Sequence, residues 1–373
     1  MPFSLEWLAE PSHSDESAIM IASGSAPGFG HSDDPPDFDY LTWSGERRPL
    51  LGIRYDDSKG SDFNRPPWLL LIPSAETHYF AFAPSEEIEV HDIYWVDILK
   101  KELFGYQTVC ELMTTHGEDA IAIGSKWLTY VCDEDQTTWH AFSLEDPSIT
   151  NSFQLPFDEE FSKSFEPFWL DADTLILDRG GKSETRCIVD LSDSSAPVVS
   201  CQEFDLYITL GRFSPDGDLM EVRVSIDTTY LNPQEIGVLN TACFSSSIGC
   251  FPNLFPSPFG SEAAGVFLED SAWLPDSSGI LYIQLQSIIS AWADNTYLWL
   301  FDIHQRKFTQ IAYIDEPLEI NPYFNHLSAF WSPDGARVLL QNINNIYAFD
   351  LNDGTLQLLS DEGGVAIGTI VLP

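Results

Sequence analysis

The sequence predicts an all-β fold, a single β-propeller of seven four-stranded blades, with six or eight blades as alternatives. Three observations lead to this prediction. A hairpin pattern recurs about every 50 residues along the 373-residue chain. A second motif, a tight turn between two strands, precedes the hairpin in the later repeats. No long segment has the helical spacing of apolar residues that would place an α-helix against a core.

The hairpin pattern consists of a few mostly apolar residues, then Asp, Ser or Asn, and then a turn. Its polar residue falls at Ser44, Asp97, Ser143, Asp190, Asn240, Asp302 and Asp350. A polar turn and another apolar segment follow, as in Leu351-Asn-Asp-Gly354 before residues 355–359. Asn-Asp-Gly is a strong signal for a turn between two strands, so each repeat predicts a β-hairpin.

The second motif places an aromatic residue before a Pro-Asp turn. It occurs as Phe213-Ser-Pro-Asp-Gly217, Trp273-Leu-Pro-Asp-Ser-Ser-Gly279 and Trp331-Ser-Pro-Asp-Gly335, and without Pro or Gly at 168–173. Pro presets φ, Asp accepts hydrogen bonds from nearby backbone N–H groups, and Gly takes a positive φ. Strands are therefore expected directly afterwards, at 219–224, 280–284 and 337–341. The aromatic side chain is expected to fill the gap between neighbouring sheets.

Each repeat thus supplies four antiparallel strands, the pattern of one propeller blade. A single blade cannot bury both of its faces, whereas blades arranged around an axis bury them against each other. We expect one domain over residues 1–373, with the clearest repeats at 205–360. The ring is expected to close either by pairing a strand at 3–8 with the last blade or through the C-terminal strand at 365–372.

The aromatic-Ser-Pro-Asp-Gly repeats resemble those of TolB-type propellers. They are also similar to the N-terminal propellers that gate dipeptidyl-peptidase and prolyl-oligopeptidase enzymes. The resemblance implies a protein that binds protein partners at one face of the ring. It implies no functional residue, because the shared motif is structural. Serine-peptidase activity is not expected, since the Gly-x-Ser-x-Gly motif does not occur in the chain.

The six cysteines indicate disulfides rather than a zinc ribbon, because no Cys-x-x-Cys occurs. The expected pairs are Cys187–Cys201 across one hairpin, Cys243–Cys250 around a short loop, and the remaining Cys110–Cys132 within the third repeat. Disulfides persist in oxidising compartments, so we predict an extracellular or periplasmic protein whose leader is absent from this numbering. Reduced thiols in a cytoplasmic protein are the alternative.

The chain is strongly acidic, with 17 Lys and Arg against 58 Asp and Glu, a net charge of −41. A field of this sign repels phosphate backbones and anionic membrane surfaces, which excludes nucleic-acid binding. No apolar run approaches the roughly 18 residues of a membrane span. Because 44% of the residues are hydrophobic, we expect a folded body with the charge on its surface. The expected partner is a protein that is basic or bound through bridging cations, and its binding is expected to weaken as salt rises.

The sequence contains no catalytic constellation that we can name. The eight histidines form no metal-binding motif, and Gly180-Gly181-Lys182-Ser183 lacks the earlier glycine of a phosphate-binding loop. We expect no cofactor, apart from calcium at an oxygen-rich loop. Asp33, Asp34 and Asp37 are the candidate ligands, and a solvated acidic loop is the alternative.

Two aromatic segments are candidate contact surfaces for a partner. They supply Phe251, Phe255 and Phe259 in one case, and Tyr323, Phe324 and His326 in the other. The proline content of the first segment argues against a regular strand there. Exposed aromatic side chains mark binding surfaces. The alternative is that these rings fold over the edge of a blade.

The predicted function is that of a non-enzymatic, extracytoplasmic binding or scaffold protein that holds a protein partner at its loop face. The alternative is a carbohydrate-active hydrolase or lyase in which acidic residues converge on the axial channel. Two carboxylates there would serve as acid and base. A sensor or gating domain is a third interpretation.

Overall fold

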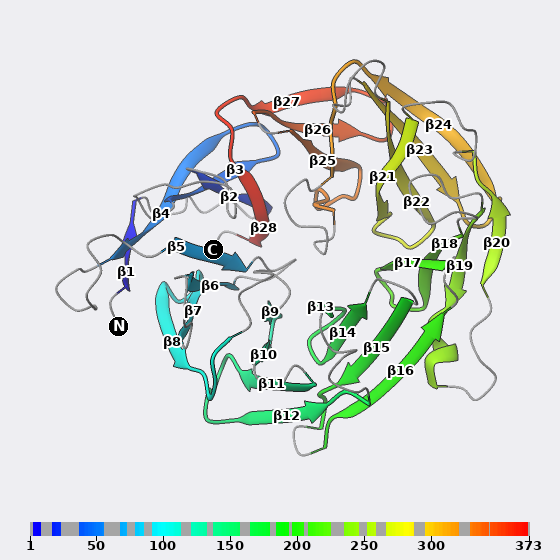
Figure 1. Cartoon of the computed structure of the whole chain (residues 1–373). Helices are drawn as coiled ribbons and strands as arrows, with labels where there is room; N and C mark the ends of the chain where they lie inside the picture. The colour runs from blue at the N-terminus through cyan, green and yellow to red at the C-terminus, as the bar shows by residue number, and fades with distance from the viewer. Residues whose placement is uncertain are drawn as a thin grey trace.

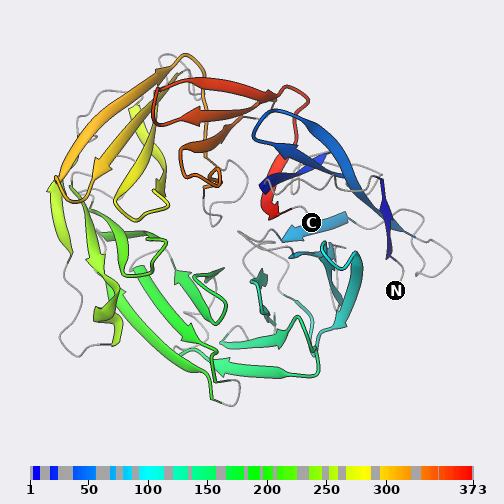
Figure 2. The ribbon, with the colours of Figure 1, turned by 180° about the vertical axis from the view of Figure 1, so that it is seen from behind.

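Seven antiparallel sheets stand around a common axis in the computed structural model of the protein (Figure 1). The view from behind shows the same closed ring (Figure 2). The structure describes residues 3–8, 17–23, 37–55, 68–72, 79–85, 92–112, 121–132, 137–156, 165–179, 184–193, 196–204, 208–224, 235–245, 252–258, 266–286, 295–320, 329–342 and 344–371. The all-β, seven-bladed prediction is confirmed. Among the described residues, no helix is long and apolar enough to cross a membrane.

Blades are numbered here in chain order. Blade 1 contains β1 (Phe3–Trp7), β4 (Arg47–Tyr55), β3 (Asp37–Thr42), β2 (Ser17–Ser23) and β28 (Val365–Val371) in that spatial order. Blade 2 contains β5 (Trp68–Ile72), β6 (Tyr79–Ser85), β7 (Asp92–Asp97) and β8 (Glu102–Gln107). Blade 3 contains β9 (Ile121–Ile123), β10 (Trp127–Val131), β11 (Thr138–Ser143) and β12 (Thr150–Gln154).

In blades 2 to 7 the strands run from the inside to the outside of the ring in chain order, whereas blade 1 runs from β1 on the outside to β28 on the inside. Blade 4 contains β13 (Glu166–Trp169), β14 (Thr174–Arg179), β15 (Glu184–Asp190) and β16 (Val198–Phe204). Blade 5 contains β17 (Ile208–Phe213), β18 (Leu219–Val224), β19 (Glu235–Asn240), the short 3-10 helix η3 (Thr241–Ser245) and β20 (Asn253–Pro256). Blade 6 contains β21 (Val266–Trp273), β22 (Gly279–Gln286), β23 (Asn295–Asp302) and β24 (Lys307–Ile314). Blade 7 contains β25 (Arg337–Gln341), β26 (Ile346–Asp350) and β27 (Leu356–Ser360).

The ring closes through the C-terminal strand. β28 pairs antiparallel with β2, from Ser17 opposite Val371 to Ala22 opposite Val365, and so completes blade 1 on its inner side. The alternative, a first strand paired with the last blade, is wrong, because β1 instead pairs with β4 at the outer edge of blade 1. Only alternate residues of β1 point inward, and its buried Phe3 packs against Phe82 of blade 2.

The Ser-Pro-Asp-Gly turns adopt the geometry that their residues predict. The Ser214 hydroxyl accepts a hydrogen bond from the backbone N–H of Leu219 (2.9 Å) and donates one to Asp216 (2.6 Å). Gly217 takes a φ of 75°, which residues with a Cβ rarely adopt. The aromatic residue before the turn reaches the neighbouring blade, since the indole N–H of Trp273 donates to the backbone carbonyl of Arg212 (2.8 Å).

Two of the three predicted disulfides are confirmed, and the third is described at one of its cysteines only. Cys187 and Cys201 face each other across β15 and β16 and form a disulfide, and Cys110 is bonded to Cys132. Cys243 is disulfide-bonded as well, while its predicted partner Cys250 lies outside the described residues.

The first of the two aromatic segments, the one that supplies Phe255, contains a short strand, contrary to the prediction. Residues Asn253–Pro256 form β20, which pairs with β19 at the outer edge of blade 5. An edge strand needs ladder hydrogen bonds on one side only, so a proline at its end is tolerated. Gly237 of β19 permits the pairing, because a Cβ there would lie 2.0 Å from the carbonyl oxygen of Asn253.

Acid is expected to destabilise the Ser-Pro-Asp-Gly turns. Hydrogen bonds from Ser214 and Ser332 hold the pKa of Asp216 and of Asp334 below the ordinary range. A carboxyl whose pKa is depressed by folding stabilises the protein above its unfolded pKa, and this stabilisation is lost as pH falls through the folded pKa. We expect the melting temperature to fall between about pH 5 and about pH 3. The fall should be shallower in a Ser214→Ala/Ser332→Ala variant, and equal slopes in the two proteins would contradict the assignment.

Candidate functional site

Of the six predicted contact residues, the structure describes Phe255 alone. Phe251, Phe259, Tyr323, Phe324 and His326 lie outside the described residues. Phe255 lies on β20, half-buried, with its ring centroid 5.5 Å from that of Phe301 in blade 6. The Arg306 guanidinium lies 5.4 Å above the same ring. Phe255 thus packs over the edge of the next blade, and a role in partner binding stays a prediction.

The candidate calcium loop is described only at Asp37. This residue begins β3, and its carboxylate forms an ion pair with the Arg54 guanidinium at 2.7 Å. Asp33 and Asp34 lie outside the described residues. Calcium binding therefore stays a prediction, and an ion at Asp37 would have to compete with Arg54.

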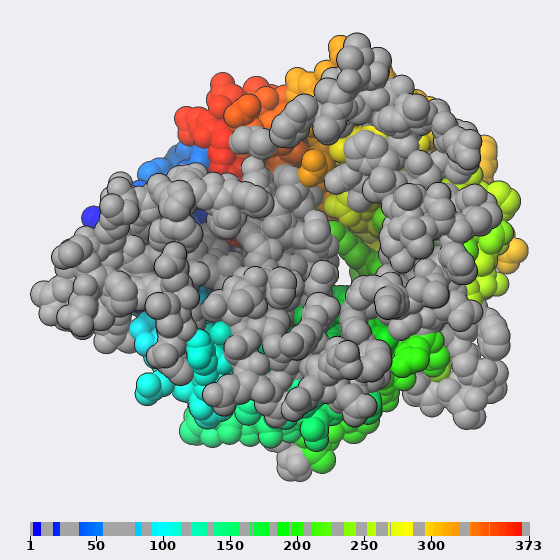
Figure 3. Space-filling model, viewed as in Figure 1, coloured from blue at the N-terminus to red at the C-terminus, as the bar shows by residue number. Residues whose placement is uncertain are grey.

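The first strands of blades 5 and 6 bring two opposite charges together near the axis. Arg212 lies on β17 and Asp270 on β21, and their side chains approach to 3.4 Å with about a fifth of each exposed (19% and 21%). Both strands carry a register irregularity at this level, between Leu210 and Phe213 and between Leu268 and Asp270. Such bulges turn a side chain away from the regular strand direction. Figure 3 shows an opening near the middle of the ring, bordered in part by green atoms of the middle blades.

A buried ion pair on β18 lies close to Arg212 and Asp270. The Arg223 guanidinium contacts the Glu221 carboxylate at 2.6 Å and donates to the Ser271 hydroxyl at 2.8 Å. Ser271 donates in turn to Glu221, which is fully buried. Gly211 makes room for this carboxylate, because a Cβ there would lie 2.4 Å from a Glu221 oxygen. We call Arg212, Glu221, Arg223, Asp270 and Ser271 the blade 5–6 charge cluster.

Burial changes the acid–base properties of this cluster. Burial raises the pKa of Asp270, and the nearby Glu221 charge raises it further, against the opposing influence of Arg212. Burial also raises the pKa of Tyr282 well above its ordinary value, with Glu221 as the next cause. Asp270 therefore keeps its proton to a higher pH than an exposed aspartate does.

A third arginine joins blade 4 to blade 5. Arg186 of β15 is buried, forms an ion pair with Asp178, and donates to the backbone carbonyl of Gly211 at 2.7 Å. Its guanidinium lies 5.7 Å from the ring centroid of Phe168 and 5.2 Å from that of Phe213. The aromatic residue before the Ser-Pro-Asp-Gly turn thus packs on an arginine of the preceding blade.

This inter-blade network was not predicted from the sequence. Glu221 and Arg223 alternate with apolar residues in a predicted strand, and this pattern usually places charges on a solvent-exposed face. The one available signal was a set of arginines inside apolar strands in a chain that has only 10 arginines.

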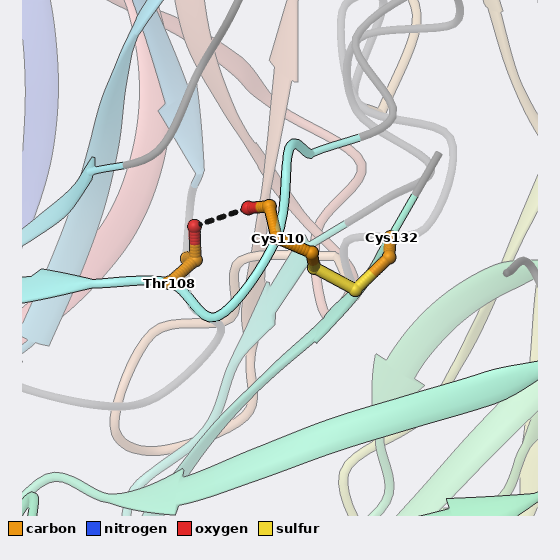
Figure 4. The surroundings of a disulfide bond; sticks show 3 residues. All are labelled: Thr108, Cys110 and Cys132. Atoms are coloured by element: carbon orange, nitrogen blue, oxygen red, sulfur yellow. Dashed lines mark hydrogen bonds between the residues drawn. A yellow bond between two sulfur atoms is a disulfide. The ribbon is translucent and has the colours of Figure 1, made fainter. Parts of the chain in front are cut away.

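One further group of side chains has the composition of a metal site. Cys110, Cys132 and His140 each place a potential ligand atom within 4.8 Å of the others. Among the described residues, no other set of three His, Cys, Asp or Glu meets this criterion. Figure 4 shows the two cysteines joined as a disulfide, with the Thr108 hydroxyl donating to the Cys110 carbonyl at 2.6 Å.

Comparison with known proteins identifies the fold and no family. No family model and no curated protein sequence matches the chain. A protein from Lactobacillus plantarum is 13% identical, with a TM-score of 0.54 over 94% of this chain and 98% of its own. A functionally unknown protein from Desulfotomaculum acetoxidans is 9% identical, with a TM-score of 0.55 over 96% and 99%. An oligogalacturonate lyase in complex with manganese is 11% identical, with a TM-score of 0.51 over 95% and 86%.

These similarities support a propeller and nothing finer, because the identities are low. The resemblance to TolB-type propellers stays a prediction, since no family model supports it.

Proposed function

We propose that the protein is a binding module that holds a basic protein partner at an acidic face of its ring. The observation that carries this proposal is the large excess of carboxylates over basic side chains. Eight described basic side chains already form ion pairs: Arg47, Arg48, Arg54, Lys100, Lys126, Arg186, Arg212 and Arg223. With 58 carboxylates in the chain, most of the negative charge has no basic side chain to neutralise it.

Two further observations support this proposal. A ring of seven sheets is a rigid scaffold, and loops that connect the strands of such a scaffold commonly carry binding sites. The disulfides are typical of an oxidising compartment, which supports an extracytoplasmic location.

Binding of a lysine-rich peptide tests the proposal. We expect the peptide to bind at low salt and a matched peptide with glutamine in place of lysine not to bind, as measured by calorimetry. The affinity should fall steadily as ionic strength rises, because the Debye length shrinks to about 8 Å at physiological salt. Equal affinities for both peptides, or an affinity that does not change with ionic strength, would contradict a role for the acidic face.

A carbohydrate-active enzyme is the second candidate, favoured by Asp270. This aspartate has a raised pKa, lies near the axis and interacts with a second carboxylate, Glu221. An acid with a raised pKa beside a carboxylate is the arrangement that glycoside cleavage uses. Both groups also contact arginines, at 3.4 Å and 2.6 Å, which favours a structural role for them.

Incubation with a panel of oligosaccharides decides between the two functions. The panel includes oligogalacturonate with Mn²⁺, because a protein of similar fold is a lyase for that substrate. The binding proposal predicts no new reducing ends and no unsaturated product. Product formation that is abolished by Asp270→Asn and retained by Asp37→Asn would establish the enzyme instead.

A further inference from the structure

A histidine lies beside one of the two disulfides that the structure describes in full. His140 is on β11, directly opposite Tyr130 of β10, and Cys132 is the first residue after β10. Cys110 comes from the segment after β8, and its sulfur lies within 4.8 Å of the Cys132 sulfur and of a His140 ring nitrogen. Cys187 and Cys201 belong to no such group among the described residues.

We propose that Cys110, Cys132 and His140 form a Zn²⁺ site when their disulfide is reduced. Two thiolates and one imidazole are the ligands that Zn²⁺ prefers over oxygen donors. With Zn–S bonds of about 2.3 Å, tetrahedral coordination places two sulfurs about 3.8 Å apart. In the structure the two sulfurs are bonded to each other, and a potential ligand nitrogen of His140 lies within 4.8 Å of both. After reduction the sulfurs must therefore move apart to reach this arrangement, with the imidazole already beside them. A site with three protein ligands leaves the fourth position to water.

The reaction balances with a dithiol as the reductant. The disulfide takes two electrons and two protons, its S–S bond breaks, and the dithiol is oxidised to its own disulfide. Zn²⁺ then displaces one proton from each of the two thiols, while the neutral imidazole donates a ring nitrogen lone pair. Metal binding therefore releases two protons per ion.

The local structure allows the two sulfurs to separate without loss of the sheet. Cys110 is half-buried outside the strands, and Cys132 lies beyond the end of β10, where an isolated bridge joins it to Leu112. Neither cysteine belongs to the β10–β11 ladder, which pairs residues 127–131 with residues 139–143. The His140 ring stacks on Tyr130 with centroids 5.1 Å apart, which limits its rotation. The charge of −41 attracts divalent cations to the protein.

The cross-link between the end of blade 2 and blade 3 would exist in two chemical forms, a disulfide and a metal site. Cys110 follows the last strand of blade 2, and Cys132 and His140 belong to blade 3. A disulfide fixes this connection in an oxidising compartment, and Zn²⁺ would fix it in a reducing one. The proposal does not depend on the binding function, and the metal site forms only where the disulfide is reduced.

Cobalt titration of the reduced protein tests this proposal. The full chain is reduced with a phosphine, desalted without oxygen and titrated with Co²⁺, which gives thiolate charge-transfer and tetrahedral d–d absorption bands. We expect one equivalent of Co²⁺ to bind and Zn²⁺ to displace it. We also expect Zn²⁺ to raise the melting temperature of the reduced protein and not that of the oxidised protein.

Three variants assign the spectrum to the proposed ligands. His140→Gln should weaken Co²⁺ binding by more than about 10-fold, and Cys110→Ser should abolish the thiolate bands. A Cys187→Ser/Cys201→Ser variant is the matched control and should bind as the wild type does. Circular dichroism of oxidised His140→Gln, whose fold needs no metal, shows whether this variant is folded. No cobalt spectrum in the reduced wild type, an unaffected His140→Gln, or loss in the control variant would each overturn the proposal.

Discussion

Truncation of the chain after Gly364 is expected to open the ring and to abolish the cooperative unfolding transition. The truncated protein lacks β28, whose Val365, Ala366 and Ile367 are almost fully buried and whose backbone pairs with β2. Burial of a Val or Ile side chain stabilises a protein by about 1.5–3 kcal/mol. The loss of two such side chains and a strand ladder approaches the roughly 5–15 kcal/mol that stabilise a typical domain.

A second truncation, after Val371, is the matched control. It removes only Leu372 and Pro373 and keeps the whole of β28. Calorimetry should show a wild-type transition for this control and a lost or strongly lowered transition for the shorter chain. Similar melting temperatures for the two truncated proteins would contradict closure of the ring through β28.

Replacement of Arg186 by Ala is expected to cause the largest loss of stability from a single substitution. The change leaves Asp178 without its ion pair, removes the hydrogen bond to the Gly211 carbonyl, and empties the space between the Phe168 and Phe213 rings. Removal of one partner from a buried ion pair costs about 3–5 kcal/mol. Denaturant unfolding measures this loss.

Arg48→Ala is the control for this substitution. Arg48 also pairs with a carboxylate, Glu46, but about half of each side chain is exposed. Exposed pairs contribute about 0–1 kcal/mol, so Arg48→Ala should be nearly neutral. Comparable losses for the two variants would show that Arg186 does not have the buried, bridging role assigned to it. An Arg186→Met/Asp178→Leu variant should recover part of the stability, because no charge is then left without a partner.

The repeats made most of the fold predictable from sequence. Six of the seven polar residues of the hairpin pattern are the last residues of β7, β11, β15, β19, β23 and β26, and Ser44 lies two residues after the end of β3. The strands expected after Gly217 and Gly335 match β18 and β25 residue for residue. These features depend on turn residues and strand alternation, which are local in the sequence. Ring closure depends on a pairing between residues about 350 apart, so both alternatives had remained open.

The charge network could not be predicted, because its partners come from different blades. Glu221 and Ser271 are 50 residues apart and meet only when blade 6 packs on blade 5. The Cys110–Cys132 pair was predictable, whereas the approach of His140 follows from the β10–β11 register and from the bridge between Leu112 and Cys132. The spacing of residues within one repeat predicts strands and turns. Contacts between side chains of adjacent blades can be identified only in the assembled ring.

The affinity of the lysine-rich peptide for the full chain and for the chain truncated after Gly364 is the most direct test of the proposed function. The removed residues, Val365–Pro373, include no charged side chain, so the two proteins carry the same net charge of −41. If the closed ring presents an organised acidic face, the truncated chain should bind about 10-fold more weakly, a difference of about 1.4 kcal/mol. Equal affinities at the same salt concentration would mean that the peptide responds to charge alone, and would contradict binding by the propeller face.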